Sequence, residues 1–281
     1  MLKLIKTVRE LQITYFCECK QVKMSKRPLI LVTNDDGILA PGIRNLIHIM
    51  NSIGEVIVVA PDSPQSAMGH AITINKTLFC KKEHINNGPQ KEYSTSGTPA
   101  DCVKLAIHEL LDRKPDLCVS GINHGSNSSI NVIYSGTMSA AIEAGMSGIP
   151  AIGFSLLNYN WDADFSAAES YIKTLCLKVL KKGLQKGIIL NVNVPNLAEK
   201  DIKGLKVCRQ ANANWVEKFD KRQSPMGRIY YWLTGEFINH DKGKDTDEWA
   251  LEEGYISVVP VQFDLTAHQY LSKLNDWDLN G

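Results

Sequence analysis

The 281-residue sequence predicts an α/β fold, in which a parallel sheet is flanked by helices. Leu29–Val32 is an apolar run of strand length without alternation, which is typical of a strand buried on both faces. Pro41-Gly42 then opens a segment whose apolar residues are spaced three and four apart, as in a helix. These apolar residues are Ile43, Leu46, Ile47 and Met50. Strand and helix patterns then alternate, which indicates a parallel α/β sheet.

Further elements follow in the same order. Apolar runs predict strands at Glu55–Ala60, Asp116–Ser120, Ala151–Ser155 and Ile188–Val192. Helices are predicted from Pro99 to Leu111, from Met138 to Gly145 and around Ala168–Val179. Thr98 and Asp101 suit a capping box at the start of the first of these helices. We also expect a strand pair at Ala71–Leu78 and the region to Tyr93, with Asn86–Pro89 as its turn.

The pattern changes from about Leu205. Arg228–Leu233 and Glu236–Ile238 flank Thr234-Gly235, which predicts a hairpin rich in aromatic residues. An isolated hairpin is marginal in water, so we expect this one to pack on a partner subunit. The predicted architecture is therefore a Rossmann-like parallel sheet flanked by helices, with a C-terminal β-hairpin extension at about 205–245 used in oligomerisation. A short helix at Glu248–Glu253, a strand at Tyr255–Pro260 and a last short helix complete the chain.

The first residues differ from the rest. Met1–Lys23 is rich in Lys and lacks the long apolar core of a secretory signal. Met24 lies just before the first strand and suggests the native start, although a short amphipathic helix packed on a partner is the alternative. We divide the chain into a non-essential extension at residues 1–26 and one domain at 27–281. We expect a chain that starts at Met24 to keep its activity and melting temperature.

The composition excludes several classes of protein. A net charge of +1 argues against a nucleic acid polymer or an anionic membrane as partner, and no apolar run approaches the length of a membrane span. The seven cysteines include no Cys-x-x-Cys pair. A disulfide framework or a zinc site is therefore not expected, and a cytoplasmic location is.

Asp35 and Asp36 are adjacent carboxylates where the first strand meets the first helix. Open α/β sheets bind their ligands at this carboxyl edge. At about 4 Å and an effective dielectric constant near 20, two such charges repel by roughly 4 kcal/mol, so one holds a proton or a cation lies between them. Mg²⁺ prefers oxygen ligands of this kind. A capped turn formed by Asn34–Gly37 is the alternative.

Three further polar segments are expected at the same edge: Asp62–His70, Gly121–Asn127 and Ser135–Thr137. The last begins a helix, whose free N–H groups suit an oxyanion. Carboxylates, hydroxyls, amides and a helix N-terminus together predict a phosphate site with a divalent ion. The sequence lacks Gly-x-Gly-x-x-Gly after its first strand and lacks Gly-x-x-x-x-Gly-Lys-Ser/Thr, which argues against a dinucleotide-binding domain and a P-loop NTPase.

These segments resemble the SurE family, the survival-protein-E nucleotidases, from about Leu29 to Ser155 and more weakly to Pro260. The motifs that carry the resemblance are Asn34-Asp35-Asp36-Gly37, Ala60-Pro61-Asp62 with Ser66 and Gly69-His70, Ser96–Val103, Ser120-Gly121-Ile122-Asn123 and Ser135-Gly136-Thr137. The resemblance implies a metal-dependent phosphatase that acts on nucleoside monophosphates. It also implies exchanged C-terminal segments, in a homodimer or homotetramer.

The resemblance implies one divalent ion, Mg²⁺ or Mn²⁺. The implied metal ligands are Asp35, Asp36, Ser66 and Asn123. Asp36 is the expected catalytic residue, as base or nucleophile, although a water activated by the ion is an open alternative. The residues expected to contact the phosphate are Gly69, His70, Ser135, Gly136 and Thr137. His124 stands where the family usually has a basic or glycine residue, which puts the substrate contacts of that loop in doubt.

Two other functions remain open. A phosphoacceptor receiver domain also has paired acids after its first strand, but it needs an Asp at the end of the third strand, where this chain has Ser120-Gly121. A non-catalytic nucleotide-binding protein would share the site without turnover. Base preference, 5′ against 3′ specificity and activity on polyphosphate are not determined by these residues.

Overall fold

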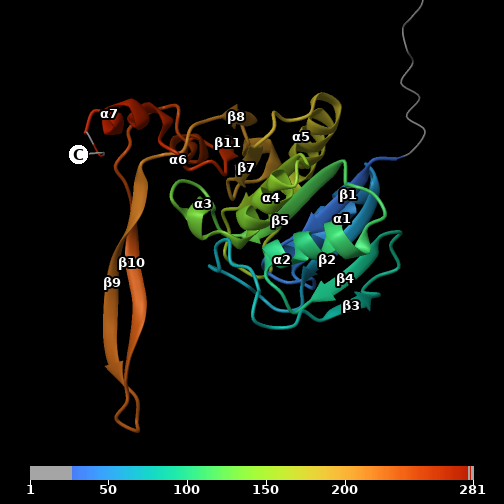
Figure 1. Cartoon of the computed structure of the whole chain (residues 1–281), viewed down its shortest axis with the longest axis horizontal. Helices are drawn as coiled ribbons and strands as arrows, with labels where there is room; N and C mark the ends of the chain where they lie inside the picture. The colour runs from blue at the N-terminus through green and yellow to red at the C-terminus, as the bar shows by residue number, and fades with distance from the viewer. Residues whose placement is uncertain (1–26, 278, 280–281) are drawn as a thin grey trace, which may run out of the picture.

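The computed structural model of the chain describes residues 27–277 and 279. At its centre is a nine-stranded, mostly parallel sheet with helices on both faces (Figure 1). The strand order is β3-β4-β2-β1-β5-β6-β7-β11-β8, in which β3 and β11 run antiparallel to β4 and β7, respectively. The predicted α/β fold is confirmed. The predicted extension at residues 1–26 lies outside the described residues.

The elements of this central unit follow one another in alternation. Its strands are β1 Leu29–Thr33, β2 Glu55–Pro61, β3 Cys80–Glu83, β4 Lys91–Thr95, β5 Leu117–His124, β6 Ala151–Leu156, β7 Ile188–Val194, β8 Leu205–Val207 and β11 Ile256–Gln262. The longer helices are α1 Pro41–Asn51, α2 Pro99–Leu105 with a π-helical turn at Ala106–Leu110, α4 Gly136–Met146 and α5 Glu169–Lys182. The short helices are α3 Asn131–Tyr134, α6 Asp247–Glu252 and α7 Leu271–Asn275. Within the described part of the chain, no helix is both long enough and apolar enough to cross a membrane.

Strand β1 is buried on both faces, as its unbroken apolar sequence predicts. Ile30 and Val32 belong to the core formed with α1 and α5, whereas Leu29 and Leu31 belong to the core formed with α2 and α4. Because successive side chains of a strand point to opposite faces, such a strand must be apolar throughout. Helix α4 lies close against the sheet: a Cβ added to Gly145 would come within 2.7 Å of Ile189.

The direction of winding reverses at β1, and this reversal positions the site. The chain passes from β1 through α1 to β2 on one side, whereas β5 pairs with β1 on the other. Thr33 lies opposite Ser120 in this pairing, so the residues that follow β1 meet the end of β5. Such a reversal leaves a crevice at the carboxyl ends of the strands, where α/β sheets bind ligands.

The start of α2 confirms the predicted capping box. The Thr98 hydroxyl accepts a hydrogen bond from the Asp101 backbone N–H at 3.2 Å, and the Asp101 carboxylate accepts one from the Thr98 N–H at 2.9 Å. Pro99 occupies the first helical position, where a missing N–H costs nothing. The helix start is therefore fixed locally, by Thr98, Pro99 and Asp101.

The strand predicted at Ala71–Leu78 is wrong. This mostly exposed segment pairs with no strand of the described residues, and side chains bind two of its backbone groups instead. The Thr73 N–H donates to Asp101, and the Ala71 carbonyl accepts a hydrogen bond from the Thr98 hydroxyl. The antiparallel pair in this region consists of β3 and β4, which are joined through residues 84–90.

The C-terminal hairpin is present, but its predicted turn at Thr234-Gly235 is wrong. Strand β9 (Ala213–Gln223) pairs with β10 (Ile229–Asn239), and the chain turns between them at residues 224–228. Gly235 lies opposite Glu217, and a Cβ there would come within 2.8 Å of the Val216 carbonyl oxygen. This glycine therefore permits close approach of the strands rather than a turn. The hairpin projects away from the central sheet (Figure 1).

Candidate active site

A cavity of about 230 Å³ opens at the reversal point of the sheet, where β1 and β5 end. Four residues expected in the site line it: Asp35, Ser66, Asn123 and Ser135. They come from the end of β1, the loop after β2, the end of β5 and the start of α4. The structure thus brings together side chains that are far apart in the sequence, as the shared carboxyl edge predicts.

Asp35 is buried beneath the N-terminus of α4. Its carboxylate accepts a hydrogen bond from the Thr137 hydroxyl at 2.5 Å. A Cβ on Gly136 would lie 2.8 Å from the second carboxylate oxygen, so only glycine lets this carboxyl group come so close to the helix. Burial, followed by the charge of Asp36, raises the pKa of the Asp35 carboxyl from 3.8 to about 7.

Asp36 turns toward His124 at the end of β5. One carboxylate oxygen of Asp36 accepts a hydrogen bond from the His124 backbone N–H at 3.2 Å and lies 3.0 Å from the ring Nδ1. The imidazole stacks on Trp161 at 5.6 Å between ring centroids and meets the edge of Phe165 at 5.1 Å. His124 therefore holds the Asp36 carboxylate, a role that its sequence position beside Asn123 could have suggested.

Ser66 and Asn123 complete the polar lining next to Asp35. The loop that carries Ser66 is tied to β1, because the Gln65 N–H donates to the Asp35 carbonyl at 2.7 Å. The Asn123 side-chain N–H donates to the Gly125 carbonyl at 2.8 Å, and its Oδ1 is the group that can coordinate a cation. Both residues thus present a neutral oxygen beside a buried carboxylate.

The donor set fits a hard divalent cation. It consists of two carboxylates, a hydroxyl and an amide oxygen, which are the ligand types of Mg²⁺ and Mn²⁺. In residues 27–277 and 279, no group of three or more His, Cys, Asp or Glu side chains is placed to hold a metal, so the fit rests on the neutral oxygens as well. The raised pKa of Asp35 supports this fit, because a bound cation would offset both the burial and the charge of Asp36 that disfavour the ionised carboxylate.

Of the five residues expected to contact the phosphate, Ser135, Gly136 and Thr137 lie at the start of α4, whereas Gly69 and His70 make other contacts. Ser135 lines the cavity and caps α4, where its Oγ accepts a hydrogen bond from the Met138 N–H at 3.0 Å. Its own O–H is left to donate. Gly136 and Thr137 follow at the start of the helix, against Asp35. The Gly69 N–H, in contrast, donates to the Tyr134 carbonyl at 3.1 Å and so holds the loop to α3.

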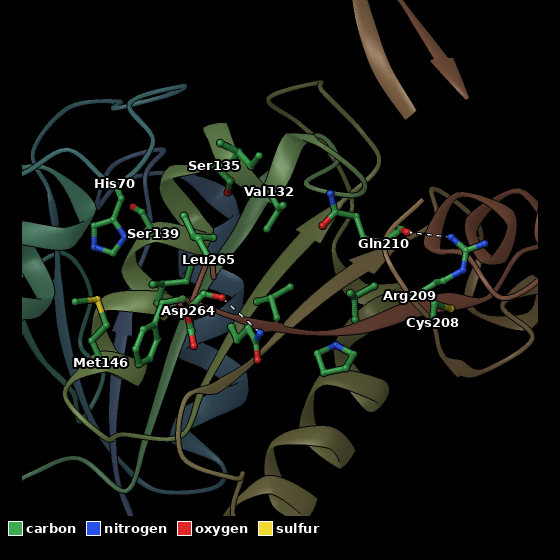
Figure 2. A pocket seen from close by; sticks show the side chains of 17 residues that line it. His70, Val132, Ser135, Ser139, Met146, Cys208, Arg209, Gln210, Asp264 and Leu265 are labelled. Atoms are coloured by element: carbon green, nitrogen blue, oxygen red, sulfur yellow. Dashed lines mark hydrogen bonds between the residues drawn. The ribbon is translucent and has the colours of Figure 1, made fainter. Parts of the chain in front are cut away.

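His70 lines a second, larger cavity of about 870 Å³, which Ser135 and Ser139 also line (Figure 2). Its Nε2 lies 2.9 Å from a carboxylate oxygen of Glu143, and Lys104 donates to the other oxygen at 2.7 Å. Burial opposes ionisation of Glu143, but the hydrogen bonds from His70 and Lys104 outweigh it and lower the pKa of this carboxyl. The structure therefore places His70 in a hydrogen-bonded cluster with Glu143 and Lys104 and not in the lining of the smaller cavity.

Three aromatic residues of the smaller cavity were missed from the sequence. Tyr134, Tyr159 and Trp215 line it together with Asp35 and Asn123. They belong to α3, to the loop after β6 and to the hairpin strand β9. No local pattern links three such distant positions, so only the fold brings them to one rim.

Comparisons with known proteins agree with this geometry. Residues 30–217 match the family model described as survival protein SurE. A protein of Flavobacterium psychrophilum named 5′-nucleotidase SurE is 70% identical over 92% of this chain and 100% of its own length. One of Cytophaga hutchinsonii with the same name is 62% identical over 90% of this chain and 98% of its own length. The crystal structure of the SurE protein from Aquifex aeolicus covers 89% of this chain and 99% of its own, with a TM-score of 0.77 and 38% identity.

Proposed function

Because this chain belongs to the SurE family, we propose that it is a metal-dependent 5′-nucleotidase that hydrolyses nucleoside monophosphates to nucleoside and inorganic phosphate. The observation that carries the proposal is the cavity shared by Asp35, Ser66, Asn123 and Ser135, with Asp36 beside it. It combines oxygen ligands for a cation with donors for a phosphate. The names of the relatives support the choice of substrate.

We assign one Mg²⁺ or Mn²⁺ ion to the ligands Asp35, Asp36, Ser66 and Asn123. When bound, such an ion stabilises the charge that develops on the phosphoryl oxygens. The carboxylates also repel an anionic substrate, so this neutralisation favours its entry. The raised pKa of Asp35 supports the assignment, since this buried carboxyl lies beside the charge of Asp36, and a bound cation favours its ionised form.

We assign the phosphate to the N-terminus of α4. The Ser135 hydroxyl donates to a phosphate oxygen, and the backbone N–H groups of Gly136 and Thr137 lie at the positive end of the helix dipole. Gly69 and His70 act indirectly: their contacts with Tyr134 and Glu143 fix the loop that carries Ser66. The set that contacts the phosphate is therefore narrower than expected from the sequence.

Asp36 is the proposed catalytic residue. His124 binds one of its carboxylate oxygens through both its backbone N–H and its ring Nδ1, which fixes the orientation of the carboxylate. A carboxylate held in this way accepts a proton from the attacking water, or attacks the phosphorus itself. Both roles, base and nucleophile, require the negative charge of Asp36, so Asp36→Asn is expected to abolish either role.

A panel of substrates tests the activity. The purified chain, supplied with Mg²⁺ or Mn²⁺, is expected to release phosphate from 5′-AMP and 5′-GMP. The same panel with 3′-AMP and polyphosphate extends the assay to 3′-nucleotidase and exopolyphosphatase activities. Binding of AMP without release of phosphate would favour a non-catalytic nucleotide-binding protein. Stable transfer of phosphate to the chain would favour a phosphoacceptor.

We propose that the chain forms a homodimer or homotetramer through its hairpin. Tyr230, Tyr231 and Trp232 are exposed on β10 within the described chain, and large apolar side chains exposed together on one element mark an interface. Light scattering at micromolar concentration is expected to give at least twice the mass of one chain. A clean monomer under these conditions would rule out the proposal.

We also propose that the protein acts in the cytoplasm. Its described cysteines at positions 80, 102, 118, 176 and 208 are free thiols, which suits a reducing compartment. Fractionation of cells that express the chain tests this, because a periplasmic or membrane fraction would contradict it.

A further inference from the structure

The rim of the smaller cavity carries more aromatic surface than phosphate chemistry requires. Tyr134, Tyr159 and Trp215 line the cavity that holds Asp35 and Asn123. These three side chains are 53%, 73% and 41% exposed, respectively. A phosphate and a hard divalent ion take their partners from N–H groups, hydroxyls and carboxylates, so these rings suit a flat, apolar part of a ligand.

The rings of Trp215 and Tyr159 are held in place despite their exposure. The Trp215 indole N–H donates to the Asn131 side-chain oxygen at 2.8 Å, and the ring packs on Phe237 at 5.5 Å between centroids. Tyr159 rests on the backbone of Gly125, where a Cβ would meet the ring at 2.3 Å. Pre-positioned rings lose little freedom when a flat ligand stacks on them.

We propose that Tyr159 and Trp215, together with Tyr134, form a stacking site for the nucleobase of the substrate. This inference rests on the proposed function and extends it from phosphate to base. A nucleoside monophosphate has the required parts: an anion for the start of α4 and a flat π-system for the rim. Every base has such a face, so aromatic stacking binds all of them.

The polar groups near the rim indicate that base identity is read weakly. The Asn131 side-chain oxygen accepts the Trp215 N–H, and the Asn127 side-chain N–H donates to Ser155 at 2.8 Å. One polar group of each amide is therefore engaged in holding the walls. With stacking as the main contact, we expect purine and pyrimidine nucleotides both to be substrates, with the larger purines bound more tightly.

Ribose 5-phosphate, which keeps sugar and phosphate but lacks the base, separates the two parts of the site. Tyr159→Ala and Trp215→Ala are expected to raise KM for AMP by about 5- to 150-fold, the range measured for loss of a base–aromatic stack. Turnover at saturation and the parameters for ribose 5-phosphate stay unchanged, because stacking contributes equally to ground and transition states. Tyr159→Phe and Trp215→Phe keep a ring and are expected to restore most of the affinity.

Trp232→Ala is the matched control, because Trp232 is an exposed tryptophan of the same hairpin that does not contact the cavity. It is expected to leave KM for AMP unchanged. Light scattering on each variant shows whether the hairpin still assembles, and Tyr159→Ala tests the site independently of the hairpin.

Three outcomes overturn the stacking site. The first is an unchanged KM for AMP in both alanine variants, and the second is an equal loss on AMP and ribose 5-phosphate. If the parent hydrolyses neither AMP nor ribose 5-phosphate, the proposed function fails. Calorimetry then compares the affinity for AMP of the metal-stripped parent and of the metal-stripped alanine variants, which tests the stacking site without activity. Equal AMP affinity in the parent and the alanine variants is the third outcome, whereas weaker binding in the variants supports the site.

Discussion

Asp36→Asn is expected to lower turnover of a nucleoside monophosphate by at least about 10²-fold, because a positioned acid–base group contributes 10²–10⁴-fold. The change keeps size and shape but removes the negative charge that a ligand, base or nucleophile needs. The amide oxygen of the new side chain can still accept the hydrogen bonds from His124 that Asp36 accepts at 3.2 and 3.0 Å. Steady-state kinetics on AMP with saturating Mg²⁺ or Mn²⁺ measures the loss.

Stability distinguishes this role from that of a capped turn. Without metal, Asp36→Asn removes the charge that, after burial, raises the pKa of Asp35, so the variant is expected to melt no lower than the metal-free parent. Asp112→Asn, at an exposed carboxylate just before β5 and thus at the opposite edge of the sheet, serves as the control and keeps full activity. Near-normal turnover of Asp36→Asn would remove this residue from the catalytic site.

The metal-free protein is expected to lose stability as the pH rises from about 4 to above 7. The pKa of Asp35 is about 7 in the folded chain, against an ordinary value of 3.8, so between these values the folded state keeps a proton that the unfolded state has released. The contribution of this group is complete below pH 4 and is lost as the pH passes 7. The shift corresponds to roughly 4 kcal/mol.

Asp35→Asn isolates this effect from other titrating groups. Urea unfolding in the presence of a chelator, compared between the parent and Asp35→Asn from pH 4 to 8, is expected to show the steeper decline in the parent alone. Divalent ions compete with the proton on Asp35, so their affinity for the parent is expected to rise over the same pH range. Parallel pH curves for the two proteins would mean that Asp35 keeps an ordinary pKa.

The fold was predictable where local sequence and burial agree. The unbroken apolar run of β1 follows from a position between two helical layers, and the capping box at Thr98 fixes the start of α2. Ala71–Leu78 and Thr234-Gly235 were mispredicted because tertiary contacts decide there. Asp101 and Thr98 satisfy the backbone of the first segment, and the close approach of β9 requires the glycine of the second.

The site was predictable as far as it follows strand ends. Asp35 and Asn123 end adjacent parallel strands, so the sheet brings them together. Tyr159 and Trp215 lie on a loop and on a distant hairpin, and no periodicity relates such positions. The His70 side chain points to Glu143, a buried carboxylate of α4. The sequence of the loop that carries His70 does not reveal this partner, so the contact could not be predicted from it.

Removal and return of the metal test most directly whether Asp35 and Asp36 hold a catalytic ion. The chain is stripped with a chelator, dialysed, and titrated with Mn²⁺ or Mg²⁺ while phosphate release from AMP and bound metal are measured together. We expect no hydrolysis in the chelated protein and a return of activity that is complete at one ion per chain. Full turnover of AMP by the chelated protein would contradict the assignment of these two carboxylates.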